Sequence, residues 1–304
     1  MGWKSELTRI LQDSQSQTSR LRFDEPISKH VHFGIGGNAA AYFEISAVSK
    51  LAAVANLKKR LHVPVSIIGR GSNLLVSDSG YPGIVIRLIG AFDRLEFEGD
   101  RVWVGAGVSQ PRLSKIAGRK GLSGVEFALG IPGSVGGALI MNAGAWGSCF
   151  GDSVELVQVM TDEGTLIELN HDEAKFGYRH SGLEEYFCVT GARLQLTPGD
   201  VKAITNRTNE LYKRKIATQP FAEENAGCMF KNPPDDSAGR LIDECGLKGY
   251  RIGGAEVSKI HGNFILNIDH ATAEDILNLV RHIQKTVKRE KGIELEMEVK
   301  LLGF

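Results

Sequence analysis

The sequence has no excess of charge of either sign and no long apolar run. Lysine plus arginine and aspartate plus glutamate each number 36 among the 304 residues, so no global field favours nucleic acid or an anionic membrane. No apolar run could span a bilayer, and the first residues, 1–21, lack the apolar stretch of a signal peptide. We therefore expect a cytoplasmic protein that binds neither nucleic acid nor membrane.

Cysteine is scarce and scattered. The four cysteines are Cys149, Cys188, Cys228 and Cys245, and no two of them form a C-x-x-C pair. The histidines form no cluster with the spacing of metal ligands. This pattern argues against a disulfide framework and a structural zinc site, and predicts reduced thiols and no metal.

Glycine is in excess, with 36 residues where roughly 7% of a chain is ordinary. A first glycine-containing turn follows a predicted strand and is followed by another: Gly69-Arg70-Gly71-Ser72-Asn73. Its small residues could bring backbone N–H groups against a phosphate. It lacks the third glycine and the following helix of a Rossmann fingerprint. From these residues alone, an ordinary β-turn and an anion-binding turn are equally supported.

A second segment, residues 130–145, is rich in residues without bulk. It could leave space for a large flat ligand and its diphosphate beside exposed backbone donors. A tightly packed core segment is the alternative, but it would give up apolar burial, so we favour binding. The candidate residues are Pro132, Gly133, Ser134, Gly136, Gly137, Asn142, Ala143 and Gly144.

The order of strands and helices predicts an α+β chain. Short β-rich runs separated by turns predict strands, two pairs of them hairpins, at residues 63–68, 83–88, 95–97 with 102–104, 154–160 with 165–169, and 187–196. Proline position, capping residues and helical periodicity predict helices at residues 111–121, 200–215, 237–245 and 272–290. Pro198-Gly199 is the predicted domain boundary.

The C-terminal residues alternate strictly and predict one strand over 293–301. Its apolar face would include Leu295 and Leu301, and its other face would present Glu294, Glu296 and Glu298. Periodicity does not choose among these three carboxylates.

Together, residues 68–78, the Pro-Gly-Ser-Val-Gly-Gly run and Met141-Asn142-Ala143-Gly144 resemble an FAD-binding domain of the vanillyl-alcohol-oxidase type. The version they resemble is that of UDP-N-acetylenolpyruvoylglucosamine reductases, in the shorter form of that family. The run beginning at His32 is also similar, although the family usually has threonine at that position. The resemblance covers residue 28 to the C-terminus.

The resemblance implies catalytic roles for three residues. In Tyr178-Arg179-His180-Ser181, Arg179 would lie near the flavin and the substrate carboxylate, which a guanidinium can hold bidentately. In the run ending Phe230-Lys231-Asn232-Pro233, Cys228 stands where the family has a serine proton donor. An unperturbed thiol, with a pKa of about 8.5, is a better acid than an alcohol, so the exchange is chemically tolerable. Of the terminal glutamates, the motif selects Glu298.

The resemblance also implies a substrate side and an order of domains. Substrate-binding candidates are Tyr178, Lys213, Lys231, Asn232 and His261, with Lys259 and Asn263 in a matching segment. The implied domains are an N-terminal helical segment at 1–27, an FAD-binding domain at 28–197, and a smaller α+β substrate-binding domain at 198–304, whose last strand returns to the flavin.

The implied reaction is the NADPH-dependent reduction of UDP-N-acetylenolpyruvoylglucosamine through non-covalent FAD, in peptidoglycan precursor synthesis. Two alternatives stay open: an FAD-dependent sugar or alcohol oxidase of the same fold, and a non-catalytic nucleotide-sugar binding protein. Such oxidases commonly attach FAD through a histidine near the phosphate loop, and the turn at Gly69 has none. The binding protein predicts a colourless preparation.

Overall fold

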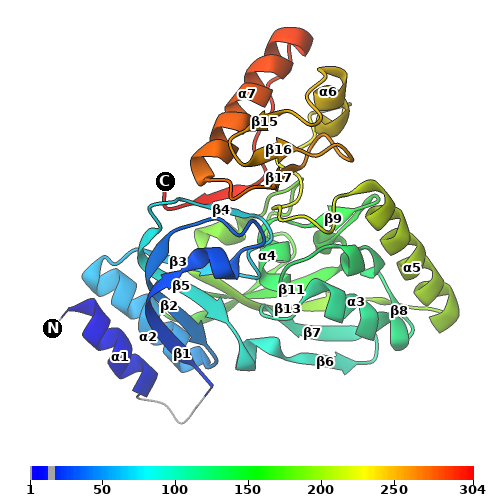
Figure 1. Cartoon of the computed structure of the whole chain (residues 1–304). Coiled ribbons are helices and arrows are strands. Elements are labelled where there is room, and N and C mark those ends of the chain that lie inside the picture. The colour runs from blue at the N-terminus through cyan, green and yellow to red at the C-terminus, as the bar shows by residue number, and fades with distance from the viewer. Residues whose placement is uncertain (1, 13–17) are drawn as a thin grey trace. The chain divides into compact units, whose positions relative to one another are not determined.

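The computed structural model describes residues 2–12 and 18–304, whose helices and strands are drawn in Figure 1. The chain divides into two compact units. The described residues of the first unit are 2–12, 18–23, 40–69 and 83–214, and the second unit comprises 24–39, 70–82 and 215–304. Each unit buries its own apolar core. The units are discontinuous in sequence, and the chain last passes from one to the other after Arg214. The domain boundary at Pro198-Gly199 remains a prediction.

The larger sheet of the first unit is antiparallel, with the strand order β12-β11-β13-β7-β6. Both predicted hairpins are confirmed, and Gly99 and Gly164 take positive φ angles of 60° and 78° in their turns. The strands are β6 Leu95–Glu98, β7 Arg101–Gly105, β11 Val154–Met160, β12 Leu166–Asn170 and β13 Cys188–Gln195.

A second sheet has the order β1-β2-β5-β3, and the chain passes between the two units within β1, β2 and β5. Its strands are β1 Arg20–Pro26, β2 Asn38–Ile45, β3 Val65–Ile68 and β5 Tyr81–Leu88. Strands β3 and β5 are parallel, with Val65 opposite Ile84. The shorter strands of the first unit are β8 Leu122–Ser123, β9 Gly144–Ala145, β10 Ser148–Cys149 and β14 Thr197–Pro198.

The helices of the first unit include two that the sequence analysis did not predict, α2 and α4. Helix α4 lies inside the second glycine-rich segment, where Ser134 caps it by accepting from the Gly137 N–H. The helices are α1 Trp3–Gln12, α2 Val48–Leu61, α3 Gln110–Arg119, α4 Val135–Ile140 and α5 Val201–Thr218, the last four residues of which belong to the second unit. Short 3-10 turns lie at Gly90–Asp93, Glu126–Gly130, Phe150–Ser153 and Gly182–Glu185, and the second unit has one at Ile27–His30.

The second unit packs two helices with short strands. Both predicted helices are confirmed, and Thr272 and Asp275 form a capping box at the start of α7. Gly292 ends α7 with a φ of 71°. The elements are α6 Ala238–Glu244, α7 Ala273–Lys291, the antiparallel sheet of β15 Arg251–Ile252, β16 Ala255–Val257 and β17 Ile265–Asn267, and the parallel pair β4 Leu74–Val76 with β18 Lys300–Leu302.

The prediction of one strand over 293–301 was wrong in extent. Only Lys300–Leu302 forms a strand, because the preceding residues bond to the irregular segment around Met229 rather than to a continuous strand. The predicted burial of Leu301 was also wrong, since its exposed fraction is 45% whereas that of Leu302 is 8%. Leu295 is buried and Glu294 and Glu296 are exposed, so the alternation holds in the first part of the segment.

Among residues 2–12 and 18–304, none of the helices combines the length and the apolar character that crossing a membrane requires.

Candidate active site

The two glycine-containing segments of the predicted cofactor site meet in the first unit. A Cβ atom on Gly69 would lie 2.2 Å from the Ser134 Oγ, so any side chain at this position would have to displace that hydroxyl. Gly133 accepts a hydrogen bond from the Gln110 N–H at 3.1 Å, and Ser134 pairs with Ser109. The contacts with Ser109 and Gln110 therefore hold the second segment in place, and its Ser134 contacts Gly69 of the first turn.

The rest of the first turn belongs to the second unit and is equally tight. Gly71 has a φ of 66°, and a Cβ atom there would lie 2.3 Å from the His30 carbonyl oxygen. Its own carbonyl oxygen accepts from the His32 N–H at 3.0 Å. Burial lowers the pKa of His32 and the charge of Arg70 lowers it further, so the cation beside this turn is Arg70. A turn with two glycines, which leave backbone N–H groups accessible, and with one arginine fits the diphosphate of FAD.

Arg179 lies in a tight turn between Gly177 and His180, which exchange two backbone hydrogen bonds of 2.9 and 3.3 Å. Its φ is 54°, a left-handed value that is uncommon for a non-glycine residue. The Arg179 Nη2 donates to the Gly144 carbonyl oxygen at 3.0 Å. This bond joins the predicted catalytic arginine to the end of the second glycine-rich segment.

Asn142 ties the same two loops together. It is buried and has a φ of 41°. Its Nδ2 donates to the Gly177 carbonyl oxygen at 3.0 Å, and its Oδ1 accepts from the Gly151 N–H at 2.8 Å. Both ends of this amide therefore bond to backbone, and Ser181 adds a bond from its Oγ to the Ile140 carbonyl oxygen at 2.8 Å.

Cys228 and Glu298 lie on adjacent segments of the second unit. The Glu298 N–H donates to the carbonyl oxygen of Met229 at 2.9 Å, and Phe230 pairs with Met297. The Asn73 Nδ2 donates to the Glu298 carbonyl oxygen at 3.2 Å, while the Lys300 N–H donates to the Asn73 carbonyl oxygen at 3.1 Å. The first glycine-containing turn thus fixes the segment that carries Glu298.

Asn263 holds the segment of Cys228 from its other side. Its Nδ2 donates to the Phe230 carbonyl oxygen at 2.7 Å and its Oδ1 accepts from the Phe230 N–H at 2.9 Å. The Asn263 N–H in turn donates to Nδ1 of the half-buried His261 at 3.2 Å. Burial lowers the pKa of His261, and the charge of Lys248 adds to this effect. A neutral imidazole thereby keeps Nδ1 available as an acceptor.

The remaining substrate-side candidates differ in their surroundings. The Lys231 Nζ is paired with the Glu296 carboxylate at 2.6 Å. Asn232 accepts from the Ala238 N–H at 3.1 Å with its Oδ1, at the start of α6. Lys213 is exposed on α5, and Tyr178 is 57% exposed with the Arg179 guanidinium 5.2 Å from its ring centre. Arg179, Tyr178 and Lys213 belong to the first unit, and the other candidates of this group to the second.

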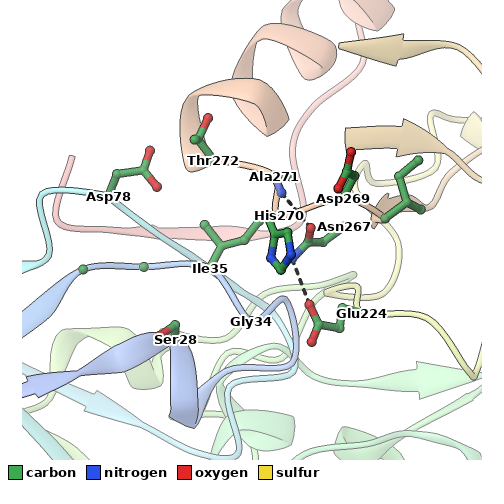
Figure 2. A pocket seen from close by; sticks show the side chains of 13 residues that line it. Ser28, Gly34, Ile35, Asp78, Glu224, Asn267, Asp269, His270, Ala271 and Thr272 are labelled. Carbon is green, nitrogen blue, oxygen red and sulfur yellow. Dashed lines mark hydrogen bonds between the residues drawn. The ribbon is translucent and has the colours of Figure 1, made fainter. Parts of the chain in front are cut away.

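The second unit also contains a polar pocket of about 550 Å³, shown in Figure 2. Asn267 donates to the Glu224 carboxylate at 2.8 Å within it and accepts from the Ala271 N–H at 2.8 Å. None of the predicted catalytic, cofactor or substrate residues lines this pocket, which is formed by Ser28, residues 34–37, Asp78, Glu224 and residues 267–272.

Comparison with known proteins assigns families to both parts of the chain. Residues 219–302 match the family model described as UDP-N-acetylenolpyruvoylglucosamine reductase, C-terminal domain. Residues 39–170 match the model described as FAD binding domain. The UDP-N-acetylenolpyruvoylglucosamine reductase of Synechococcus elongatus is 44% identical over 283 residues, covering 91% of this chain and 93% of its own. The reductase of the same name from Bacillus subtilis is 39% identical over 303 residues, covering 98% and 99%.

Solved structures agree with these matches. The UDP-N-acetylenolpyruvylglucosamine reductase from Thermus caldophilus superposes with a TM-score of 0.81 at 40% identity, covering 93% of this chain and 98% of its own. The 6-hydroxy-D-nicotine oxidase from Arthrobacter nicotinovorans has a TM-score of 0.59 at 12% identity, a likeness of fold alone. The predicted α+β fold with a vanillyl-alcohol-oxidase type FAD domain is confirmed, and the chain belongs to the UDP-N-acetylenolpyruvoylglucosamine reductase family of FAD-dependent oxidoreductases.

Proposed function

We propose that the chain reduces UDP-N-acetylenolpyruvoylglucosamine to UDP-N-acetylmuramate with NADPH, a step of peptidoglycan precursor synthesis. The observation that carries this proposal, beside family membership, is the hydrogen bond from the Glu298 N–H to the carbonyl oxygen of Met229. It places a carboxyl-bearing residue and a thiol-bearing residue, Cys228, on directly bonded segments. A reduction that adds hydride and a proton across a double bond needs such groups at its second step.

FAD, when bound, supplies the hydride that NADPH provides, and this chemistry belongs to the cofactor. The residues that would hold its diphosphate are Gly69 to Asn73 and the segment from Pro132 to Gly144. In these two segments, a Cβ atom at Gly69, Gly71 or Gly136 would lie 2.2, 2.3 or 2.9 Å from a neighbouring atom, so a side chain would be crowded at each position.

Arg179 would hold the substrate carboxylate. Hydride addition to the vinyl carbon develops negative charge on the neighbouring carbon and on this carboxylate, and a guanidinium stabilises it without being able to lose a proton. The bond from Arg179 Nη2 to the Gly144 carbonyl oxygen uses one nitrogen of the guanidinium and fixes its direction.

Cys228 would deliver the proton that completes the lactyl ether. Glu298 would assist from the adjacent segment, in its protonated form, by donating a hydrogen bond to the developing negative charge. The Glu298 backbone bonds to Met229 and Asn73, and Cys228 pairs with Phe264 in a β-bridge, so the two side chains start from defined places.

The proposal takes residues 28–197 as the FAD-binding domain and residues 198–304 as the domain that binds the UDP-sugar. It places the chain in the shorter form of the family. Tyr178, Lys213, Lys231, Asn232 and His261 would bind substrate, with Lys231 exchanging its Glu296 partner for a phosphate. It also includes a cytoplasmic location, since nucleotide-sugar and NADPH are supplied there.

A coupled assay tests the proposal. The purified protein should carry FAD that is released by denaturation, and should oxidise NADPH only when the enolpyruvyl UDP-sugar is present. Mass spectrometry should show a product two hydrogens heavier. Flavin that stays attached to the denatured chain, or NADPH oxidation that consumes only oxygen, would contradict the proposal.

A further inference from the structure

The hairpin of β9 and β10 follows the second glycine-rich segment and turns in two residues, Trp146 and Gly147. Ala145 pairs with Ser148 and Gly144 with Cys149 across the hairpin. The two turn residues have φ angles of 60° and 81°. Two-residue hairpin turns of type I′ require positive φ angles at both positions, and they prefer Asn, Asp or Gly at the first. A tryptophan there is held against its own backbone preference.

The contact that accompanies this conformation comes from helix α5. The Arg214 guanidinium carbon lies 4.5 Å from the centre of the Trp146 ring, within the range of a cation–π interaction. The buried residues of helix α5, Ile204 and Thr208, both lie in its N-terminal half, and Arg214 lies in its exposed C-terminal half. Trp146 is itself 40% exposed. The ring and the guanidinium thus join a strained hairpin tip to a largely exposed helix.

The base of the same hairpin carries the acceptor of Arg179. Gly144 is the first residue of β9, and its carbonyl oxygen accepts from Arg179 Nη2 at 3.0 Å. A Cβ atom on Gly144 would lie 2.3 Å from the Ser148 carbonyl oxygen, so the two hairpin strands are in close contact at the base. A tilt of a hairpin this short would turn the Gly144 carbonyl and with it the direction of the guanidinium.

We propose that Arg214, through the ring of Trp146, is a positioning residue that fixes the β9–β10 hairpin and thereby aims Arg179 at the substrate. The proposal rests on the proposed function, because it takes Arg179 as the residue that holds the substrate carboxylate. It assigns Arg214 no contact with substrate. The β9–β10 hairpin, Arg179 and Arg214 all belong to the first unit.

The test separates the two half-reactions in the FAD-loaded protein. For Arg214→Met, the rate of flavin reoxidation by the enolpyruvyl UDP-sugar should fall roughly 10- to 100-fold, since a displacement of about 1 Å can cost about 100-fold. Flavin reduction by NADPH should stay within about twofold, because that half-reaction involves no substrate carboxylate. Arg214→Lys keeps a cation over the ring and should recover much of the rate.

A matched control and a second variant isolate the contact. Arg207 lies two turns earlier on α5 and is exposed, so Arg207→Met should leave both rates unchanged. Trp146→Asn suits the turn but removes the ring, so it should behave like Arg214→Met, whereas Trp146→Phe should be intermediate. The double variant of Trp146→Asn and Arg214→Met should be no worse than either single variant.

Tryptophan fluorescence gives a readout independent of activity. The emission of Trp146 is the difference between the spectra of the wild-type protein and Trp146→Phe. Its wavelength should be shifted in Arg214→Met and unshifted in Arg207→Met. The positioning role is overturned if Arg214→Met reoxidises flavin at the wild-type rate, or if Trp146→Asn does. A wild-type protein that fails to reoxidise would instead overturn the proposed function, so the two failures are distinguishable.

Discussion

The backbone N–H of Glu298 donates to the carbonyl oxygen of Met229 at 2.9 Å, one residue beyond Cys228. This bond joins two segments that are about 70 residues apart in the chain, and side-chain amides hold it from both sides. Asn263 clasps Phe230 with two hydrogen bonds, and Asn73 bonds the Glu298 carbonyl oxygen. Acid chemistry at Cys228 and Glu298 therefore starts from a fixed backbone, and substitutions of their side chains should report on chemistry rather than on folding.

Cys228→Ser should keep the reaction, because an alcohol can also protonate carbon, whereas Cys228→Ala should lower turnover by about 10²- to 10⁴-fold. The measurement is flavin reoxidation by the enolpyruvyl UDP-sugar in a single turnover. Thermal melting serves as the control, since all three proteins should unfold alike. A Cys228→Ala protein with the wild-type rate would remove the thiol from the mechanism.

Glu298→Gln should slow the same step by about 10²- to 10³-fold, the cost of losing one group that stabilises a developing anion. The matched control is Glu294→Gln four residues earlier, whose carboxylate is exposed and paired with Lys288 at 3.1 Å. That control should turn over normally. Equal rates in the two variants would mean that the choice of Glu298 among the terminal glutamates is wrong.

Gly69→Ala should release FAD from the purified protein, because the new Cβ atom would meet the Ser134 Oγ at 2.2 Å. The flavin-to-protein absorbance ratio measures this directly. Gly118→Ala on α3 is the control, since its Cβ atom would only touch Ile204 at 3.6 Å. Alanine there should retain FAD and raise stability by up to about 1 kcal/mol. Normal FAD content in Gly69→Ala would contradict the assignment of this turn to the cofactor.

His261 should make stability depend on pH. Burial first, and then the charge of Lys248, lower its pKa in the folded protein, so the folded state prefers the neutral ring. The stability that this preference contributes is fully present above the unfolded pKa of about 6.5 and is lost as the pH falls through and below it. Protonation also takes Nδ1 from the Asn263 N–H. The melting temperature should therefore drop between about pH 7.5 and about pH 5.

His261→Asn keeps an acceptor without the titration and should flatten that drop. The control is His62→Asn, at an exposed position with a φ of 52° that asparagine tolerates. That variant should keep the wild-type pH dependence. If His261→Asn melts with the same pH dependence as His62→Asn, the imidazole does not contribute.

Local signals in the sequence predicted every strand of the larger sheet and helices α3, α5, α6 and α7, but not β1, β2, α2 or α4. Helix α7 could be predicted because Thr272, Gly292 and the spacing of Ile276, Val280 and Ile283 all agree. Helix α4 was missed because its Gly136 and Gly137 have weak helical preference, and the helix depends instead on the Ser134 cap and on packing around it. The terminal strand was predicted too long because alternating hydrophobicity indicates which side chains are buried, and not which backbone groups pair with another strand.

The chemistry of the site was predicted by resemblance and not by pattern. Nothing in the residues themselves marks Arg179 for a left-handed turn bonded to Gly144, or Asn73 as the residue that holds Glu298. These contacts join distant parts of the chain, and periodicity carries no information about them. The hairpin turn at Trp146 was not predicted either, and its contact with Arg214 could only be found in three dimensions.

Anaerobic reoxidation of the flavin tests the central claim most directly. The protein is reduced with one equivalent of NADPH in the absence of oxygen, and the enolpyruvyl UDP-sugar is then added while flavin absorbance is followed. The account predicts full return of the oxidised flavin spectrum together with formation of the lactyl ether. Flavin that stays reduced with this substrate, in protein that NADPH reduces normally, would contradict it.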